Sequence, residues 1–254
     1  MKKINLSIVL TFVFAVVLAF TSCKEVCDVI PVETETETKL DNDDAKNEKN
    51  EFDDYGEIHN KTLDFLGEKF GGKLLTTPMK EIQIALNDFA KSMGHDELKE
   101  DDFVVVEQAL KCVEDGGIID GGCIRDPFCV LFPRKCDFFD RLMKPWTYKT
   151  IESQDEVRSF IQSCRDFEDE IIVDEKLTPR ERGFGLRAIS IARYSTVYWQ
   201  NQNSDPTGSV WSGELQSAKS ICWSCVIAGD ALGGIGGPFT AGLVSGILLA
   251  NQSE

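Results

Sequence analysis

The chain has 254 residues, of which 42% are apolar, so it can bury a core of ordinary size. Its formal net charge is −16, and a chain this acidic repels the phosphates of nucleic acids and of anionic lipids. We therefore expect no nucleic acid among its partners.

The first 22 residues have the three parts of a secretory signal. Lys2 and Lys3 form a basic head, an uncharged apolar run covers 8–20, and the small residues Thr21 and Ser22 precede Cys23. The run holds about 13 residues, and at ~1.5 Å per helical residue it is shorter than a ~30 Å hydrocarbon core. The pattern predicts a leader that is cleaved and does not span the membrane.

Cys23 follows the small pair directly, so Phe20-Thr21-Ser22-Cys23 resembles the lipobox of a bacterial lipoprotein. The resemblance implies a lipid on the Cys23 thiol, although Phe20 stands where leucine is usual. Ordinary cleavage after Thr21 or Ser22, which would leave Cys23 for a disulfide, is the alternative. Lys24 in place of aspartate favours an outer-membrane destination, and Lys24-Glu25 resembles surface-export signals of Bacteroidota lipoproteins.

Residues 24–54 contain twelve acidic residues and four lysines, so the mature chain begins with a strongly charged stretch. Such a segment cannot bury enough apolar surface to offset its ordering entropy. We interpret 23–54 as a lipidated, acidic, disordered tether. Asp41, Asp43 and Asp44 suggest a calcium loop only superficially, because its glycine and bidentate glutamate are missing.

Apolar residues at helical spacing then predict a helical domain over 55–214. The first helix begins near Asp54 and stops at Gly71-Gly72, and a second begins at Thr77-Pro78, with Thr77 as N-cap, and ends at Gly94. A third is expected over 102–113, where three consecutive valines leave a short strand as the alternative. The expected buried positions of the first two helices are Ile58, Leu63, Leu66, Phe70, Ile82, Ile84, Leu86, Phe89 and Met93.

A cysteine-rich segment, 112–150, interrupts this pattern with glycines and prolines. If Cys23 carries lipid, eight cysteines remain, and an even number in an exported chain indicates disulfides whose connectivity the spacing leaves open. Zinc is disfavoured because only Cys222 and Cys225 have C-x-x-C spacing, so we expect no metal site. The candidate disulfide cysteines are Cys112, Cys123, Cys129, Cys136, Cys164, Cys222 and Cys225, with Cys27 also present.

Two strong helices follow. One is predicted over 154–172, and a capping box at Thr178 and Glu181 begins a long helix that runs through Trp199. A polar stretch, 201–208, predicts a turn. The inward positions of the first helix are Val157, Phe160, Ile161, Cys164, Phe167 and Ile171, and those of the second are Leu186, Ile189, Ala192, Arg193, Val197 and Trp199.

Residues 215–254 form a glycine-rich hydrophobic segment with Gly229, Gly233 and Gly237 at four-residue steps, and Gly242 and Gly246 likewise. This spacing predicts a hairpin of closely packed helices that turns at 236–238. Between 226 and 250 only Asp230 is charged, so the hairpin either packs within the domain or enters a membrane. Coverage of these residues by the rest of the chain would argue against membrane entry.

Three short motifs resemble a set of uncharacterised Bacteroidota lipoproteins that share their order and end in a small-residue helix. They are Tyr55-Gly56-Glu57-Ile58-His59-Asn60, Ile191-Ala192-Arg193-Tyr194-Ser195 with Tyr198-Trp199, and Gly229-Asp230-Ala231-Leu232-Gly233-Gly234. The resemblance implies an envelope protein and supplies no reaction. The tail also resembles glycine-rich segments of bacteriocin-like peptides, by composition alone.

No catalytic pattern emerges from the sequence. His59, near a helix start, and His95 are expected in capping or surface roles, and the serines fail the spacing of a nucleophile elbow. The best polar–aromatic group, interpreted as core-edge packing or as a candidate binding patch, is Arg193, Tyr194, Tyr198 and Trp199.

The sequence thus predicts an all-α fold: an irregular helical bundle with a cysteine-rich loop region and a glycine-rich C-terminal helical hairpin. The functional hypothesis is a non-catalytic interaction module at the outer membrane or cell surface. Its partners would be the membrane, through the Cys23 lipid, and a protein or small molecule, with no cofactor. The alternatives are membrane insertion of 215–250 and thiol–disulfide exchange at Cys222 and Cys225.

Overall fold

The computed structural model describes residues 40–103, 106–107, 153–218, 223–234 and 236–252, and within these ranges the chain is all-helical. The predicted fold class is therefore confirmed. The elements are α2 (Asn42–Ala45), α3 (Asp54–Lys69), the 3₁₀ helix η1 (Gly71–Thr76), α4 (Met79–Ser92), the 3₁₀ helix η2 (Glu100–Phe103), α8 (Gln154–Val173), α9 (Pro179–Ser204), α10 (Ser212–Ser217), α11 (Trp223–Gly233) and α12 (Pro238–Gln252).

Several sequence predictions concern parts outside the described residues. They are the leader 1–22, the lipid site Cys23, the tether up to residue 39 and the cysteine-rich segment 112–150. Cys222 and the side chain of Cys225 also lie outside, so the thiol-exchange hypothesis stays a prediction. Cys164 is described: it is buried in α8, within an apolar cluster shared with α9 and α11.

Local signals set the helix ends. The Thr178 side chain accepts a hydrogen bond from the backbone N–H of Glu181 at the start of α9, as its capping box predicted. Gly71 and Gly94 have φ of +43° and +82°, a conformation that favours glycine, and both lie where the sequence predicted a helix to stop. Thr77 as N-cap is wrong, because its hydroxyl donates to the Lys73 carbonyl oxygen at 2.8 Å and closes η1 instead.

Residues 40–53, which we call the docked segment, differ from the expected flexible tether. They include α2, and Leu40 and Ala45 are buried with side chains of α8 and α9. Asp41 caps α2 by accepting from the backbone N–H groups of Asp43 and Asp44. Farther along the segment, Asn47 and Asn50 donate to Glu168, more than 100 residues away. This part of the acidic stretch is therefore folded onto the domain.

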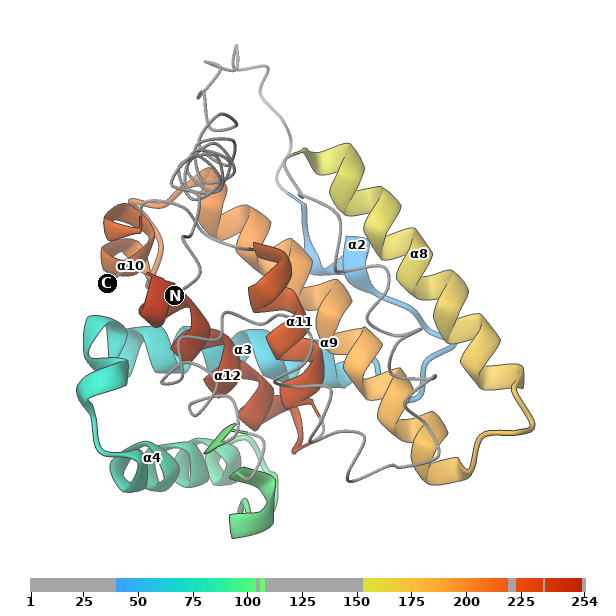
Figure 1. The fold of residues 1–254 in the computed structure, drawn as a ribbon, viewed down its shortest axis with the longest axis horizontal. Helices are drawn as coiled ribbons and strands as arrows, with labels where there is room; N and C mark the ends of the chain where they lie inside the picture. Colours follow the sequence, from blue (N-terminus) through green and yellow to red (C-terminus); the bar gives the residue numbers. More distant parts are fainter. Residues whose placement is uncertain (1–39, 104–105, 108–152, 219–222, 235, 253–254) are drawn as a thin grey trace, which may run out of the picture. The chain divides into compact units, whose positions relative to one another are not determined.

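Helix α9 lies at the centre of the domain. Between Gly183 and Trp199 every residue except Arg187 is buried. Helices α3, α8 and α11 pack along it, so it has no continuous solvent face (Figure 1). The sequence predicted one inward face, but here neighbouring helices cover α9 on several sides.

The predicted glycine-rich hairpin is present as α11 and α12. The two helices pack on each other, α11 also contacts α9, and α12 also contacts α3 (Figure 1). All residues from 238 to 250 are buried. None of the helices in the described ranges is both long and apolar enough to cross a bilayer.

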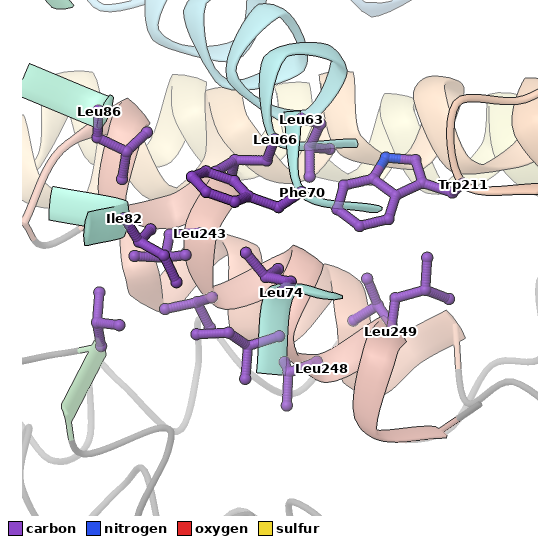
Figure 2. Close-up of a cluster of buried hydrophobic side chains, with 14 of the residues drawn as sticks. Leu63, Leu66, Phe70, Leu74, Ile82, Leu86, Trp211, Leu243, Leu248 and Leu249 are labelled. Atoms are coloured by element: carbon purple, nitrogen blue, oxygen red, sulfur yellow. The ribbon is translucent and has the colours of Figure 1, made fainter. Parts of the chain in front are cut away.

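The hairpin supplies much of the main apolar cluster. Figure 2 shows Leu243, Leu248 and Leu249 of α12 beside side chains of α3, η1 and α4. The sequence analysis placed a segment boundary between residues 214 and 215. In the structure, side chains from both sides of that boundary belong to the same apolar cluster. The other labelled members of this cluster are Leu63, Leu66, Phe70, Leu74, Ile82, Leu86 and Trp211.

A chain that ends at Ser217 is expected to lose cooperative folding, because it lacks the helices that bury this cluster. Thermal unfolding followed by circular dichroism at 222 nm checks this, with the full mature chain as control. A sigmoidal transition of the same midpoint in the truncated chain would contradict the hairpin's place in the core.

Candidate functional site

A cluster of buried polar side chains surrounds Asp230 of α11, whose relative exposure is 0%. Its Oδ2 accepts hydrogen bonds from Ser195 Oγ and, at 3.4 Å, from Trp199 Nε1, both on α9. Its Oδ1 lies 3.3 Å from Nε2 of His59 on α3. The single charge of the hairpin is therefore enclosed by polar atoms of two other helices.

The cluster extends to α12 and along α3. Trp199 Nε1 also donates to Ser245 Oγ at 3.1 Å. His59 Nδ1 lies 2.9 Å from Asn60 Oδ1, and Asn60 Nδ2 donates to the Tyr194 carbonyl oxygen at 3.2 Å. We call this set the Asp230 cluster; its members are His59, Asn60, Ser195, Trp199, Asp230 and Ser245.

The order of the groups in the Asp230 cluster does not match that of a serine hydrolase. In a catalytic triad the imidazole lies between the hydroxyl and the carboxylate, so that it can accept the hydroxyl proton. Here the carboxylate lies between Ser195 and His59. The cluster joins α3, α9, α11 and α12, and a substrate would reach it only if these helices separated, because His59, Ser195 and Asp230 are fully buried.

A second buried polar cluster lies under the docked segment. Arg193 Nη2 of α9 is 2.6 Å from Asp53 Oδ1 and 2.9 Å from Glu168 Oε1, so one guanidinium serves two carboxylates. Asn47 and Asn50 each donate an amide hydrogen to Glu168 at 2.6 Å. We call Asn47, Asn50, Asp53, Glu168 and Arg193 the Arg193 cluster.

Burial and charge set the titration of the Arg193 cluster. Desolvation raises the pKa of Glu168, and the opposing effects of Arg193 and of the two amide donors do not cancel it. Burial by itself would lower the pKa of Arg193, but Glu168 and Asp53 outweigh it and raise that pKa. The network therefore joins α8, α9 and the docked segment through charges held away from water.

A raised pKa at Glu168 predicts a pH-dependent stability difference between the wild type and Glu168→Gln. Above the unfolded-state pKa the native state binds the proton more tightly than the unfolded chain, so the stabilising contribution of Glu168 falls as pH rises through the folded-state pKa. Urea unfolding of both proteins at several pH values above 4.5 measures the difference. It should decline with rising pH, and a constant or growing difference would contradict the raised pKa.

The four residues of the sequence-predicted binding patch all lie on α9, and all are buried. Arg193 and Tyr194 contact Asp53 of the docked segment, and the Tyr194 hydroxyl donates to Asp53 Oδ2 at 3.0 Å. Tyr198 donates to Asp64 Oδ1 at 2.9 Å and accepts from Trp211 Nε1 at 3.2 Å. The four side chains are thus divided among different interfaces inside the core.

The pKa values of both tyrosines reflect these surroundings. Burial, with the nearby carboxylates of Asp53 and Asp64 respectively, raises the pKa of Tyr194 and of Tyr198 far above the ordinary phenol value. Both hydroxyls therefore remain protonated and act as hydrogen-bond donors. Their role in the structure is to satisfy carboxylates at the edges of the core.

His59 departs from its expected surface or capping role, because it is fully buried in α3. His95 is exposed, with its ring 5.3 Å from that of Phe239, in agreement with the sequence interpretation. Sequence reasoning missed Glu168 and Asp230 as centres of polar clusters. The signal that pointed toward Asp230 was the trio of short motifs, since their members His59, Ser195, Trp199 and Asp230 meet in one place.

The motifs also meet through close packing. A Cβ added at Gly56 would collide with the Tyr194 ring, and one added at Gly234 would lie 2.7 Å from Ile191 Cδ1. The three motifs that carry the resemblance are therefore neighbours in space as well as successive in sequence.

Comparison with protein-family models, with curated proteins and with solved structures finds no match to this chain.

Proposed function

We propose that this chain is an exported lipoprotein, anchored through Cys23, whose helical domain acts as a non-catalytic interaction module at the outer membrane or cell surface. The single observation that most supports the module is the burial of its polar centres. The side chains of the Asp230 and Arg193 clusters form hydrogen bonds and ion pairs between helices, so their polar groups have a structural role. The leader, the lipobox and the acidic stretch before residue 40 support export and anchoring.

The anchor is tested by comparing the wild type with Cys23→Ala in a bacterial host that processes lipoproteins. Wild-type protein should incorporate radiolabelled palmitate and fractionate with membranes, whereas the variant should do neither. A wild-type protein that carries no palmitate would overturn the anchor. Protease treatment of intact cells then distinguishes a surface-facing domain from a periplasmic one.

The interaction role is tested by photo-crosslinking in the same cells. A photoreactive amino acid at the exposed positions Ser159 and Ser163 of α8, and separately at Lys80 and Ile84 of α4, samples two outward faces. A partner bound at one face should give a discrete adduct from that pair of positions and none from the other. Absence of an adduct from every exposed position of the domain would overturn the module.

Burial of α11 and α12 supports the interaction module over membrane insertion, because insertion would first break their contacts with α3 and α9. Purified mature protein at neutral pH is therefore expected to release no dye from liposomes of bacterial lipid composition. Dye release that rises with protein concentration would instead favour the bacteriocin-like alternative. Insulin reduction that is lost in Cys222→Ser would favour thiol exchange.

A further inference from the structure

Arg187 is the one residue of α9 between Gly183 and Trp199 that is not buried. Its guanidinium carbon lies 5.5 Å from the centre of the Phe52 ring and 5.7 Å from the centre of the Tyr55 ring. The two rings meet edge to face, with their centres 5.7 Å apart. We call these three residues the Arg187 cluster; all of them are half-buried, so the cluster lies at the surface of the domain.

The guanidinium of Arg187 is held in one place by its surroundings. Its Nε donates to the carbonyl oxygen of Gly183, about one turn earlier on α9, at 3.0 Å. The two rings attract its charge. The Phe52 ring packs closely on α9, because its edge lies 3.2 Å from where a Cβ at Gly183 would be. An arginine fixed in this way loses little conformational entropy when it binds a further group.

The terminal nitrogens of Arg187 are its unused donors. Among the residues that the structure describes, neither Nη1 nor Nη2 has a hydrogen bond or an ion pair. By contrast, Arg158 pairs with Asp155, and Arg193 pairs with Glu168. The chain has 43 acidic and 27 basic residues, so carboxylates are abundant. Arg187 therefore has two free donors in a protein where most arginines could find an acid.

These donors and their surroundings indicate the chemistry of a ligand. Two N–H groups in one plane match the two oxygens of a carboxylate, and arginine with aromatic residues is typical of the strongest contacts in protein interfaces. The residues just before each ring in the chain are Glu51 and Asp54, and both are exposed. They repel a polyanion and attract lysine or arginine side chains. A partner that satisfies both conditions carries one carboxylate with basic residues around it.

We propose that the Arg187 cluster is a docking site for a partner protein, and that it binds an aspartate or glutamate side chain flanked by basic residues. The carboxylate accepts from Nη1 and Nη2, because Nε is already bonded to Gly183. Phe52 and Tyr55 contact the apolar part of the partner's side chain. This proposal rests on the interaction module proposed above, and it names the surface and the chemistry of that module's contact.

Fluorine NMR of the mature protein labelled with 3-fluorotyrosine tests the site, because the Tyr55 ring contacts the guanidinium. A Tyr55→Phe variant assigns its resonance among those of the four tyrosines. The probe is the peptide acetyl-Lys-Asp-Lys-amide, and acetyl-Lys-Asn-Lys-amide is the control without a carboxylate. The first peptide should shift the Tyr55 resonance saturably at millimolar concentration, and the second should bind about tenfold more weakly or not at all.

Two variants then assign the effect to Arg187. Arg187→Gln, which removes the charge and the fork, should abolish the shift caused by the aspartate peptide. Arg158→Gln is the matched control, because Arg158 is an exposed arginine on α8 that pairs with Asp155, and it should bind like the wild type. The comparison of the two peptides on the wild type does not depend on the folding of either variant. An equal response to both peptides, no response to either, or unchanged binding by Arg187→Gln would overturn the site.

Photo-crosslinking from Glu51 and Asp54 in cells distinguishes failure of this site from failure of the module. Both positions are exposed, and an adduct from them should be lost when Arg187→Gln is added. Adducts from α8 or α4 alone would overturn the site and leave the module standing. Absence of an adduct from every exposed position would overturn both.

Discussion

Replacing Arg193 by leucine is expected to lower the free energy of unfolding by about 3–5 kcal/mol, the range for breaking a buried ion pair at one partner. Glu168 has no exposed surface, and the Arg193 guanidinium is its cationic neighbour at 2.9 Å. After the substitution, the amides of Asn47 and Asn50 are the groups among the described residues that would still stabilise its charge. Urea unfolding followed by circular dichroism measures the loss.

Two further variants distinguish charge from packing. Arg158→Leu, at an exposed arginine of α8 that pairs with exposed Asp155, should change stability little. Adding Glu168→Leu to Arg193→Leu removes both charges and should recover a large part of the loss, because no unpaired buried carboxylate remains at position 168. If the double variant is as unstable as the sum of the single ones, electrostatics is not the cause.

Gly233→Ala is expected to destabilise the domain by about 1–3 kcal/mol or more, through overpacking between two backbones. The added Cβ would lie 2.6 Å from Ala241 Cα and 3.1 Å from its backbone nitrogen, and no side-chain rotation can relieve that contact. Helices α11 and α12 would have to separate. The midpoint of thermal unfolding, measured by calorimetry, checks the effect.

Gly213→Ala is the matched control, because a Cβ at this exposed glycine of α10 would meet nothing within 4 Å. Alanine is the better helix former by about 1 kcal/mol, so this variant should be neutral or slightly stabilised. Equal destabilisation by the two substitutions would show that close approach of the backbones is not what position 233 requires.

The residues that sequence reasoning placed well act within one segment. Thr178 caps α9 by accepting from a backbone N–H three residues away. Gly71 follows the end of α3 and has a positive φ, which a helix cannot continue through. The inward positions Val157, Phe160 and Ile161 of α8 follow from spacing alone. Such effects need no knowledge of the rest of the chain, because helix caps and apolar stripes are local.

Residues whose role was misjudged depend on partners far along the chain. Asp53 was assigned to a flexible tether, yet it accepts from Arg193, 140 positions later. His59 was expected in a capping or surface role, yet it is buried and its Nε2 lies 3.3 Å from Oδ1 of Asp230 on α11. A charged residue looks the same in sequence whether it is solvated or buried with a partner, and only the pairing of distant segments distinguishes the two.

By itself, the sequence determined the all-helical class, several helix boundaries, the turn of the glycine-rich hairpin and the acidic character of the chain. Only the tertiary structure decided that the hairpin lies inside the domain, that residues 40–53 dock on α8 and α9, and that the aromatic group of α9 is buried. The physical reason is that helical hydrogen bonds and the apolar spacing of a helix face involve residues only three or four positions apart, so a short stretch of sequence is enough to predict them. Burial of Asp230 and Glu168, by contrast, becomes favourable only after helices from opposite ends of the chain have come together.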